Sequence, residues 1–254
     1  MIPVSNQTSL GVGAVINGPA LINGNTSTDV SVTTPNVMLW CATARDLTNN
    51  TGVLNPRSIE SARTSTTPYM VGLRESIEIQ TNDGVPWQWR RICFTYKGTL
   101  PGASSTSLFA SYWEDSDGFK RISTTPAGDR NGGALYDLFF LIFAGQNASD
   151  WTDPMIAKLD RTRISVMYDY TRTIAAGNES GMIRRYNLWH KMGKTLAYDD
   201  DESGASMTTN YKSVDSKVGM GDYYVLDFFR SRQAAPTSTR MVFNPSSTLY
   251  WHEK

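Results

Sequence analysis

Cysteine and histidine are both scarce in this sequence. Its 254 residues include two cysteines, Cys41 and Cys93, and two histidines, His190 and His252. Two cysteines are too few for a disulfide scaffold or a paired-CxxC zinc site, and each lies among apolar neighbours, which predicts buried free thiols. Two histidines likewise exclude a histidine-rich metal site, and the HExxH motif is absent. We therefore expect no cofactor.

Long hydrophobic runs and a net charge are missing as well. The longest apolar run, 138–144, is far shorter than the ~20 residues of a membrane-spanning helix, so we expect no membrane partner. The first residues lack the basic and apolar regions of a signal peptide. Lys and Arg total 24, and Asp and Glu also total 24. This balance excludes a strongly basic nucleic-acid-binding protein but leaves room for a local basic patch.

Basic residues are absent from the first 35 positions. Residues 1–35 are rich in Gly, Asn, Ser and Thr, and Asp29 is their only charged residue. This composition predicts an extended N-terminal arm, because it offers too few apolar side chains for a core of its own. Residues 36–254 then form the folded domain.

From residue 36 onward the apolar pattern has mostly a period of two, and no segment keeps a period of 3.6. Such alternation predicts half-buried strands, and the unbroken apolar segment 134–143 predicts a strand buried on both faces. The expected strands are 36–45, 71–80, 89–97, 134–143, 161–173, 182–192, 222–231 and 240–252. Eight strands joined by long irregular loops predict an all-β fold, a single jelly roll in which two antiparallel sheets form a sandwich.

Catalytic motifs are hard to find. Neither histidine accompanies a serine or cysteine in a nucleophile-elbow setting. The segment 11–13 (GVG) lacks the preceding strand and third glycine of a dinucleotide-binding loop, and 193–195 (GKT) lacks the upstream glycine of a phosphate-binding loop. We therefore expect that the protein is not an enzyme. A hydrolase with paired carboxylates on a sandwich fold stays open as a third-ranked alternative, since such pairs cannot be recognised from sequence.

Four consecutive acids form the most acidic segment of the chain. They are Asp199, Asp200, Asp201 and Glu202. Such a run is typical of a solvated turn, and it is also a weak candidate for binding a hard cation such as calcium. Because four acids repel phosphates, we expect this loop to lie away from any nucleic acid.

The sequence is richest in aromatic residues interleaved with basic ones, in 87–97 and in 184–191. Aromatic rings stack on bases while Arg and Lys neutralise phosphates, so this combination favours binding of a single-stranded nucleic acid. The candidate contacts are Arg91, Lys97, Arg184, Arg185, Trp189 and Lys191. Strand alternation places Arg91 and Lys97 on one face of their strand. In the strand 182–192, alternation likewise places Arg185, Trp189 and Lys191 together on one face. The alternative is that the rings belong to the core and the basic groups pair with acids.

Several ordered blocks, together covering the chain from about residue 36 to its end, resemble one protein family. The most extensive is PYMVGLRESIEIQTNDGVPWQWRRICFTYKG at 68–98. The others are MLWCATARD (38–46), YDYTRTI (168–174), YDDDESGASMTT (198–209), GMGDYYVLDFF (219–229) and TLYWHEK (248–254). In these blocks the chain resembles the capsid proteins of genomoviruses, relatives of the geminiviruses with small circular single-stranded DNA.

The resemblance implies a jelly-roll subunit that assembles with itself into an icosahedral shell, on the order of sixty copies or a multiple, around single-stranded DNA. It implies a location in the virion, and in the host nucleus and cytoplasm during assembly. It also implies that strands 89–97 and 182–192 share one genome-facing sheet. Family members usually begin with an arginine-rich arm, which residues 1–35 do not match. The alternative is a β-sandwich module that binds a glycan or another ligand.

Overall fold

The computed structural model describes residues 4–5, 16–28, 35–49, 51–101, 112–115, 118–123 and 133–253. Almost all of its regular structure is β-strand. The strands are β1 (Val4–Ser5), β2 (Ile16–Asn17), β3 (Ala20–Asn23), β4 (Asn36–Cys41), β5 (Tyr69–Thr81), β6 (Trp87–Tyr96), β7 (Tyr112–Asp115), β8 (Gly118–Ser123), β9 (Ser165–Ile174), β10 (Met182–Thr195), β11 (Asp201–Ser203), β12 (Ser206–Thr208), β13 (Asp222–Ser231) and β14 (Arg240–His252). One helix, α1 (Ala134–Ile142), is described.

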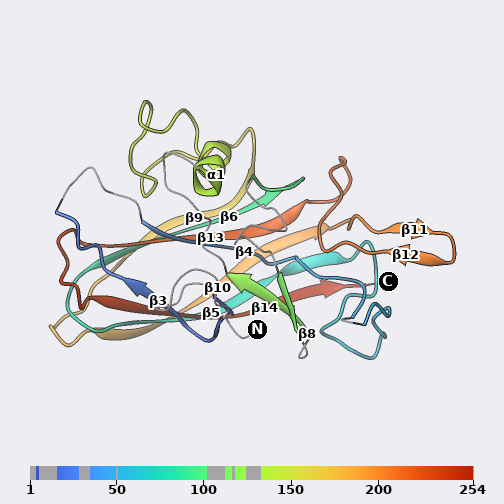
Figure 1. The fold of residues 1–254 in the computed structure, drawn as a ribbon, viewed down its shortest axis with the longest axis horizontal. Coiled ribbons are helices and arrows are strands. Elements are labelled where there is room, and N and C mark those ends of the chain that lie inside the picture. Colours follow the sequence, from blue (N-terminus) through green and yellow to red (C-terminus); the bar gives the residue numbers. More distant parts are fainter. Residues whose placement is uncertain are drawn as a thin grey trace.

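Two four-stranded antiparallel sheets form the body of the molecule (Figure 1). The β5 sheet has the order β10-β5-β14-β3, and the β6 sheet has the order β4-β13-β6-β9. Taken in chain order, the eight strands pair first with last, second with seventh, third with sixth and fourth with fifth. This nested pairing is that of a jelly roll, and it confirms the predicted all-β sandwich. A smaller sheet, β2-β1-β8-β7, accompanies the sandwich.

The space between the two sheets is filled by the apolar side of each strand. On β5, Leu73, Ile77 and Ile79 are fully buried, whereas the residues between them, apart from Glu75, are partly or fully exposed. Trp89 of β6 lies against them among aromatic rings of β13 and β14. Each buried ring or branched side chain contributes about 1.5–3 kcal/mol to stability, so the alternation in sequence fixes which side of each strand faces inward.

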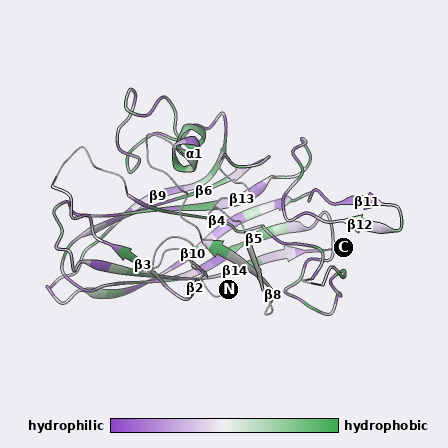
Figure 2. Ribbon diagram, viewed as in Figure 1, coloured by the Kyte–Doolittle hydropathy of each residue, from purple (hydrophilic) through white to green (hydrophobic). Residues whose placement is uncertain are grey.

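The segment predicted as a strand at 134–143 is the helix α1, and that prediction was wrong. A short apolar run cannot be distinguished from a buried helix by periodicity alone. The hydrophobic helix lies over the outer face of the β6 sheet (Figures 1 and 2). Its side chains Leu138 and Phe139 pack in one core with Ile92, Phe94 and neighbouring residues of that sheet. The β6 sheet is consequently covered on both faces, which explains why nine of the ten residues of β13 are buried.

The sandwich begins before the predicted boundary at residue 36. Strand β3 lies within the predicted arm and pairs with β14, and its residues Ala20 and Ile22 are each 1% exposed. Its neighbours on both sides are polar, so the four residues ALIN give too short a signal in isolation. Positions 1–3, 6–15 and 29–34 of the predicted arm lie outside the described residues.

Long loops leave the sandwich at one end, and one of them carries the β11–β12 hairpin, which extends beyond the sheets (Figure 1). No other strand among the described residues pairs with these two strands. Within the described part of the chain, no helix is long and apolar enough to span a membrane.

Candidate nucleic-acid interface

Strand β10 lies at the edge of the β5 sheet and carries four of the six predicted contacts. Arg185, Trp189 and Lys191 are exposed, and their odd-numbered positions place them together on one face, as predicted from alternation. The structure shows that this is the outer face of the sheet. The even-numbered residues between them point toward the core, where His190 is 4% exposed. Arg184 is also exposed, near the beginning of the strand and on its other side. The outer face of this sheet therefore presents a ring between two cations.

The Trp189 ring lies flat enough on the sheet to occupy the space above Gly72 of β5. A Cβ atom on Gly72 would lie 2.6 Å from Cζ2 of Trp189, so glycine is needed for the indole to lie there. Beyond it, Tyr250 of β14 stands with its ring centroid 5.8 Å from that of Trp189, at an interplanar angle of 52°. The two rings are 52% and 42% exposed. We call Trp189, Tyr250 and the intervening Gly72 the aromatic platform.

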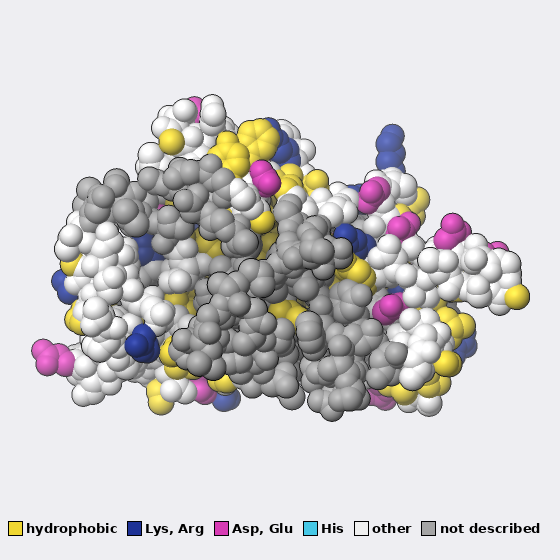
Figure 3. All heavy atoms as spheres, in the orientation of Figure 1, with side chains coloured by type: hydrophobic (Ala, Val, Ile, Leu, Met, Phe, Trp, Pro, Cys, Tyr) yellow, Lys and Arg dark blue, Asp and Glu magenta, His cyan; other side chains and the backbone are white. Residues whose placement is uncertain are grey.

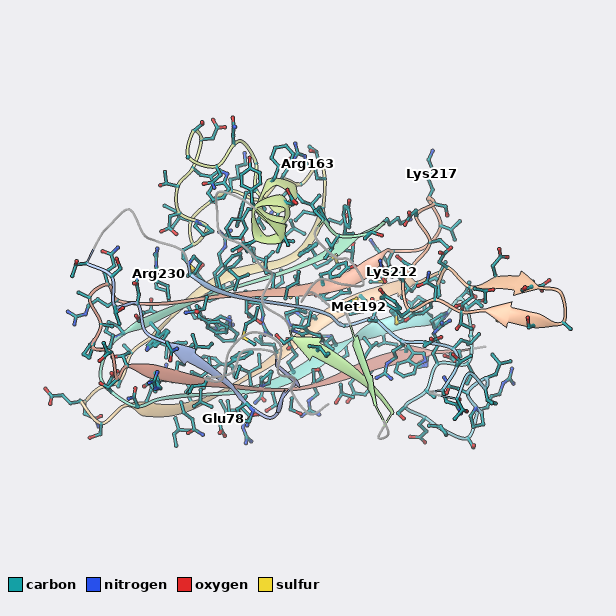
Figure 4. All side chains as sticks on the ribbon, viewed as in Figure 1. Glu78, Arg163, Met192, Lys212, Lys217 and Arg230 are labelled. Atoms are coloured by element: carbon teal, nitrogen blue, oxygen red, sulfur yellow. The ribbon has the colours of Figure 1, made fainter. Side chains whose placement is uncertain are left out.

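Cationic side chains lie on the same face of the sheet as the aromatic platform. Arg74 is exposed and lies directly across from Trp189 in the strand register, and Lys191 lies across from Gly72. Arg185 approaches Glu78, labelled on the outer side of the lower layer in Figure 4, with 3.9 Å between Nη2 and Oε2. Arg185 is 66% exposed, so this pair is weak and leaves the guanidinium free to bind an anion. Exposed rings flanked by three cations can stack bases and neutralise phosphates.

Arg74, Tyr250 and Gly72 were not among the predicted contacts. The alternation of 71–80 already places Arg74 on the polar side of its strand, so its exposure could have been read from the sequence. The contact between Trp189 and Tyr250 could not have been read from the sequence, because it depends on β5 lying between β10 and β14.

Arg91 is wrong as a predicted DNA contact. It is 0% exposed and points between the two sheets. Its Nε and Nη2 atoms donate to Oδ1 and Oδ2 of Asp227, each at 2.7 Å, and its Nη1 donates to Glu75. Alternation had correctly placed Arg91 opposite Ile92 and Phe94, but this sheet is covered on both faces, so neither face is open to DNA.

Lys97 lies away from the platform, at the end of a strand of the other sheet. It follows the end of β6, and its Nζ donates to the carbonyl oxygens of Ser216 and Val218 at 2.6 and 2.9 Å. Strands β6 and β10 belong to different sheets, which corrects the expectation that they share one. Lys97 therefore holds the 216–218 loop, and the candidate surface consists of residues from β5, β10 and β14 alone.

A buried polar cluster lies directly beneath the platform. Nε2 of His190 is 2.8 Å from Oε2 of Glu75, and its Nδ1 is 3.8 Å from Sγ of Cys93. Burial raises the pKa of Glu75, but Arg91 and the hydrogen bond from His190 outweigh it and hold that pKa below its ordinary value. Burial also raises the pKa of the Cys93 thiol. The arrangement has the composition of a catalytic triad, yet Cys93 is 0% exposed and its raised pKa favours the thiol over the reactive thiolate, so both features disfavour a nucleophilic role.

The four consecutive acids do not converge on a common point. The side chain of Asp200 is buried against Arg63, with Nη2 to Oδ1 at 3.0 Å, whereas Asp199, Asp201 and Glu202 are exposed. Among the described residues, no group of three or more acidic, cysteine or histidine side chains could hold a metal ion. The weak candidate for a cation site is therefore wrong, because an arginine already neutralises the one buried acid.

No family model matches this chain, and no curated protein matches it.

Proposed function

We propose that this chain is a viral capsid subunit that assembles with itself into an icosahedral shell and encloses single-stranded DNA. The observation that carries the proposal is the nested pairing of eight strands, because this jelly roll is a recurrent fold of viral capsid proteins. The sequence blocks that resemble genomovirus capsid proteins support it from an independent direction. In this proposal the protein works by assembly and binding, not catalysis, and resides in the virion and, during assembly, in the host nucleus and cytoplasm.

The aromatic platform supports the DNA-binding part of the proposal. Trp189 and Tyr250 offer exposed ring faces to unpaired bases, and Arg74, Arg185 and Lys191 offer cations to the phosphates. Exposed rings alone would equally suit a glycan. Three cations around them, against the single acid Glu78 paired to one of them, favour an anionic polymer.

Electron microscopy of the purified protein tests the assembly. Closed shells of uniform diameter, with nuclease-protected DNA and a raised ratio of absorbance at 260 to 280 nm, are expected. A monomer at all concentrations would overturn the proposal. A monomer that binds neutral oligosaccharides would favour the glycan-binding alternative.

Replacement of Trp189 by Ala tests the platform. Stacking on an aromatic ring contributes about 1–3 kcal/mol per base, so binding of an unstructured oligodeoxythymidine, measured by fluorescence anisotropy, should weaken roughly 5- to 150-fold. Tyr170→Ala is the matched control, because Tyr170 is an exposed ring of similar size, 55% exposed, on the other sheet. Equal losses in both variants would remove the platform as the binding site.

A further inference from the structure

A recess of about 560 Å³ lies at one end of the β6 sheet. It is formed where β6 begins and where β9 and β13 end, and most of its exposed lining surface is apolar. Besides Pro86 and Trp87, six residues with polar side chains line it. They are Gln88, Thr173, Arg230, Ser231, Arg232 and Gln233. None of the residues that line this recess is acidic. We call it the arginine recess, and the DNA-binding face proposed above does not include it.

The two arginines of the recess differ in how they are held. Arg230 donates from Nη1 to Oδ2 of Asp153 at 2.7 Å and from Nη2 to Oε1 of Gln88 at 2.8 Å, which fixes its guanidinium in place. Arg232 is exposed, and its guanidinium has no acidic partner among the described residues. A fixed arginine beside a free one is suited to receive carboxylates, because guanidinium groups bind them in a planar, bidentate geometry.

The opposite end of the molecule carries the complementary charge. Residues 199–208, here called the acidic hairpin, contain four acids and no basic residue, and every residue from Asp201 to Thr208 is exposed. The hairpin extends from one end of the long axis in Figure 1, and Figure 3 shows acidic side chains on it. Arg230 is labelled toward the other end in Figure 4. One subunit therefore has a protruding acidic element at one end and a basic recess at the other.

The hairpin is held rigidly at its base. All five N–H groups of Arg63 are used: two bind Asp200, and three bind the carbonyl oxygens of Arg45, Ser65 and Asn210. The guanidinium also lies 3.8 Å from the ring centroid of Tyr198. A two-stranded hairpin is marginally stable by itself, and this one pairs with no further strand in the part of the chain that the structure describes. Such anchoring orders an element before it meets a partner, which lowers the entropic cost of binding.

We infer that the acidic hairpin of one subunit inserts into the arginine recess of the next, with Asp201 and Glu202 paired to Arg230 and Arg232. This contact rests on the self-assembly proposed above and names the surfaces that form it. Because the two surfaces differ, the contact is heterologous, the type that closes rings when the rotation between subunits closes. The occupant is a second copy of this chain, since the described chain itself supplies the matching acids.

Charge reversal tests the contact. Asp201→Lys with Glu202→Lys, or Arg232→Glu alone, should raise the protein concentration needed for assembly at least about tenfold, because like charges then face each other. The combined variant should bring that concentration back toward the wild-type value. Glu60→Lys and Arg161→Glu are matched controls at exposed positions outside both surfaces. Circular dichroism verifies that each variant is folded.

A disulfide test gives a second readout that does not depend on closed shells. A chain with Ser203→Cys is mixed with a chain with Gln233→Cys under oxidising conditions, and a disulfide-linked dimer is expected. The native thiols Cys41 and Cys93 are buried and do not interfere. Ser149→Cys, at an exposed position, replaces Gln233→Cys in the control and should give no such dimer.

The outcomes separate the two proposals. Shells that form unchanged in all reversal variants, without the cross-linked dimer, overturn the contact and leave the capsid proposal standing. Open, charge-dependent oligomers that cross-link but never close overturn the capsid proposal and retain the contact. A wild-type protein that stays monomeric, together with Ser203→Cys and Gln233→Cys chains that form no cross-linked dimer, overturns both.

Discussion

The two faces of the β5 sheet use the same residue types for opposite purposes. Arg74 points outward into solvent, and Glu75, the next residue, points inward to Arg91. Trp189 is 52% exposed above the sheet, whereas Trp89 of the opposite sheet is fully buried below it. On the dry side every charge needs a partner, because an unpaired charge there is costly. On the solvent-exposed side a charged group keeps its hydration and has little free-energy cost, so it remains free to bind a ligand.

The largest expected effect on stability comes from removing the buried ion pairs of Arg91. Arg91→Met leaves Glu75 and Asp227 without their cation, and loss of one partner of a buried pair costs about 3–5 kcal/mol. Urea denaturation should show this loss in the free energy of unfolding. Arg74→Met, on the neighbouring β5 strand, is the matched control and should change stability by no more than about 0.5 kcal/mol. Similar losses in the two variants would contradict the distinction between the faces.

Two buried acids, Glu75 and Asp222, are expected to change the stability of the protein in opposite directions as the pH falls. Glu75 has a cation, which holds its pKa low, so its contribution to stability is lost as the pH falls through that pKa. Among the described residues Asp222 forms no ion pair, and burial raises its pKa from 3.8 to about 6, despite hydrogen bonds from Ser213 and Thr43 and the charge of Lys212. The folded state therefore binds a proton before the unfolded state does. This contribution stabilises the protein as the pH falls from about 6 toward 4.

Asp222→Asn isolates that contribution. A shift of about two pKa units corresponds to about 3 kcal/mol, present at neutral pH as a cost in the wild type. The stability of the variant relative to wild type should therefore be higher at pH 7 than at pH 4, by up to about that amount. Urea melts at several pH values measure this difference. A difference that does not change with pH would show that Asp222 titrates normally in the folded state.

The sequence predicts the sandwich well where one face of a strand is apolar and the other polar. In β5 this alternation correctly groups Ile77 with Ile79, and in β10 it correctly groups Trp189 with Arg185 and Lys191, although it leaves open which face of β10 points outward. Alternation fails for α1 because an unbroken run of apolar residues shows no periodicity that would distinguish a helix from a strand. It fails for β3 because four residues become a strand only through pairing with β14.

The candidate site shows a related limit. Alternation assigns Arg91 to the face opposite Phe94, and the structure agrees, but exposure depends on what covers each face. The helix layer covers the Phe94 side and the β5 sheet covers the Arg91 side. Neither covering element is adjacent in sequence, so local pattern alone cannot tell a buried arginine from one that is free to bind DNA.

The smallest expected effect is on the salt dependence of DNA binding, and it distinguishes two lysines that were both predicted from the sequence as DNA contacts. Lys191 is exposed beside the platform, whereas Nζ of Lys97 already donates to two carbonyl oxygens. Each phosphate of a single strand that a protein neutralises contributes about 0.7 to the slope of log K against log salt concentration. Lys191→Ala should therefore lower the magnitude of that slope by about 0.7 for oligodeoxythymidine, whereas Lys97→Ala should leave it unchanged. The same slope change in both variants would return Lys97 to the DNA-binding surface, and no change in either would place the phosphates elsewhere.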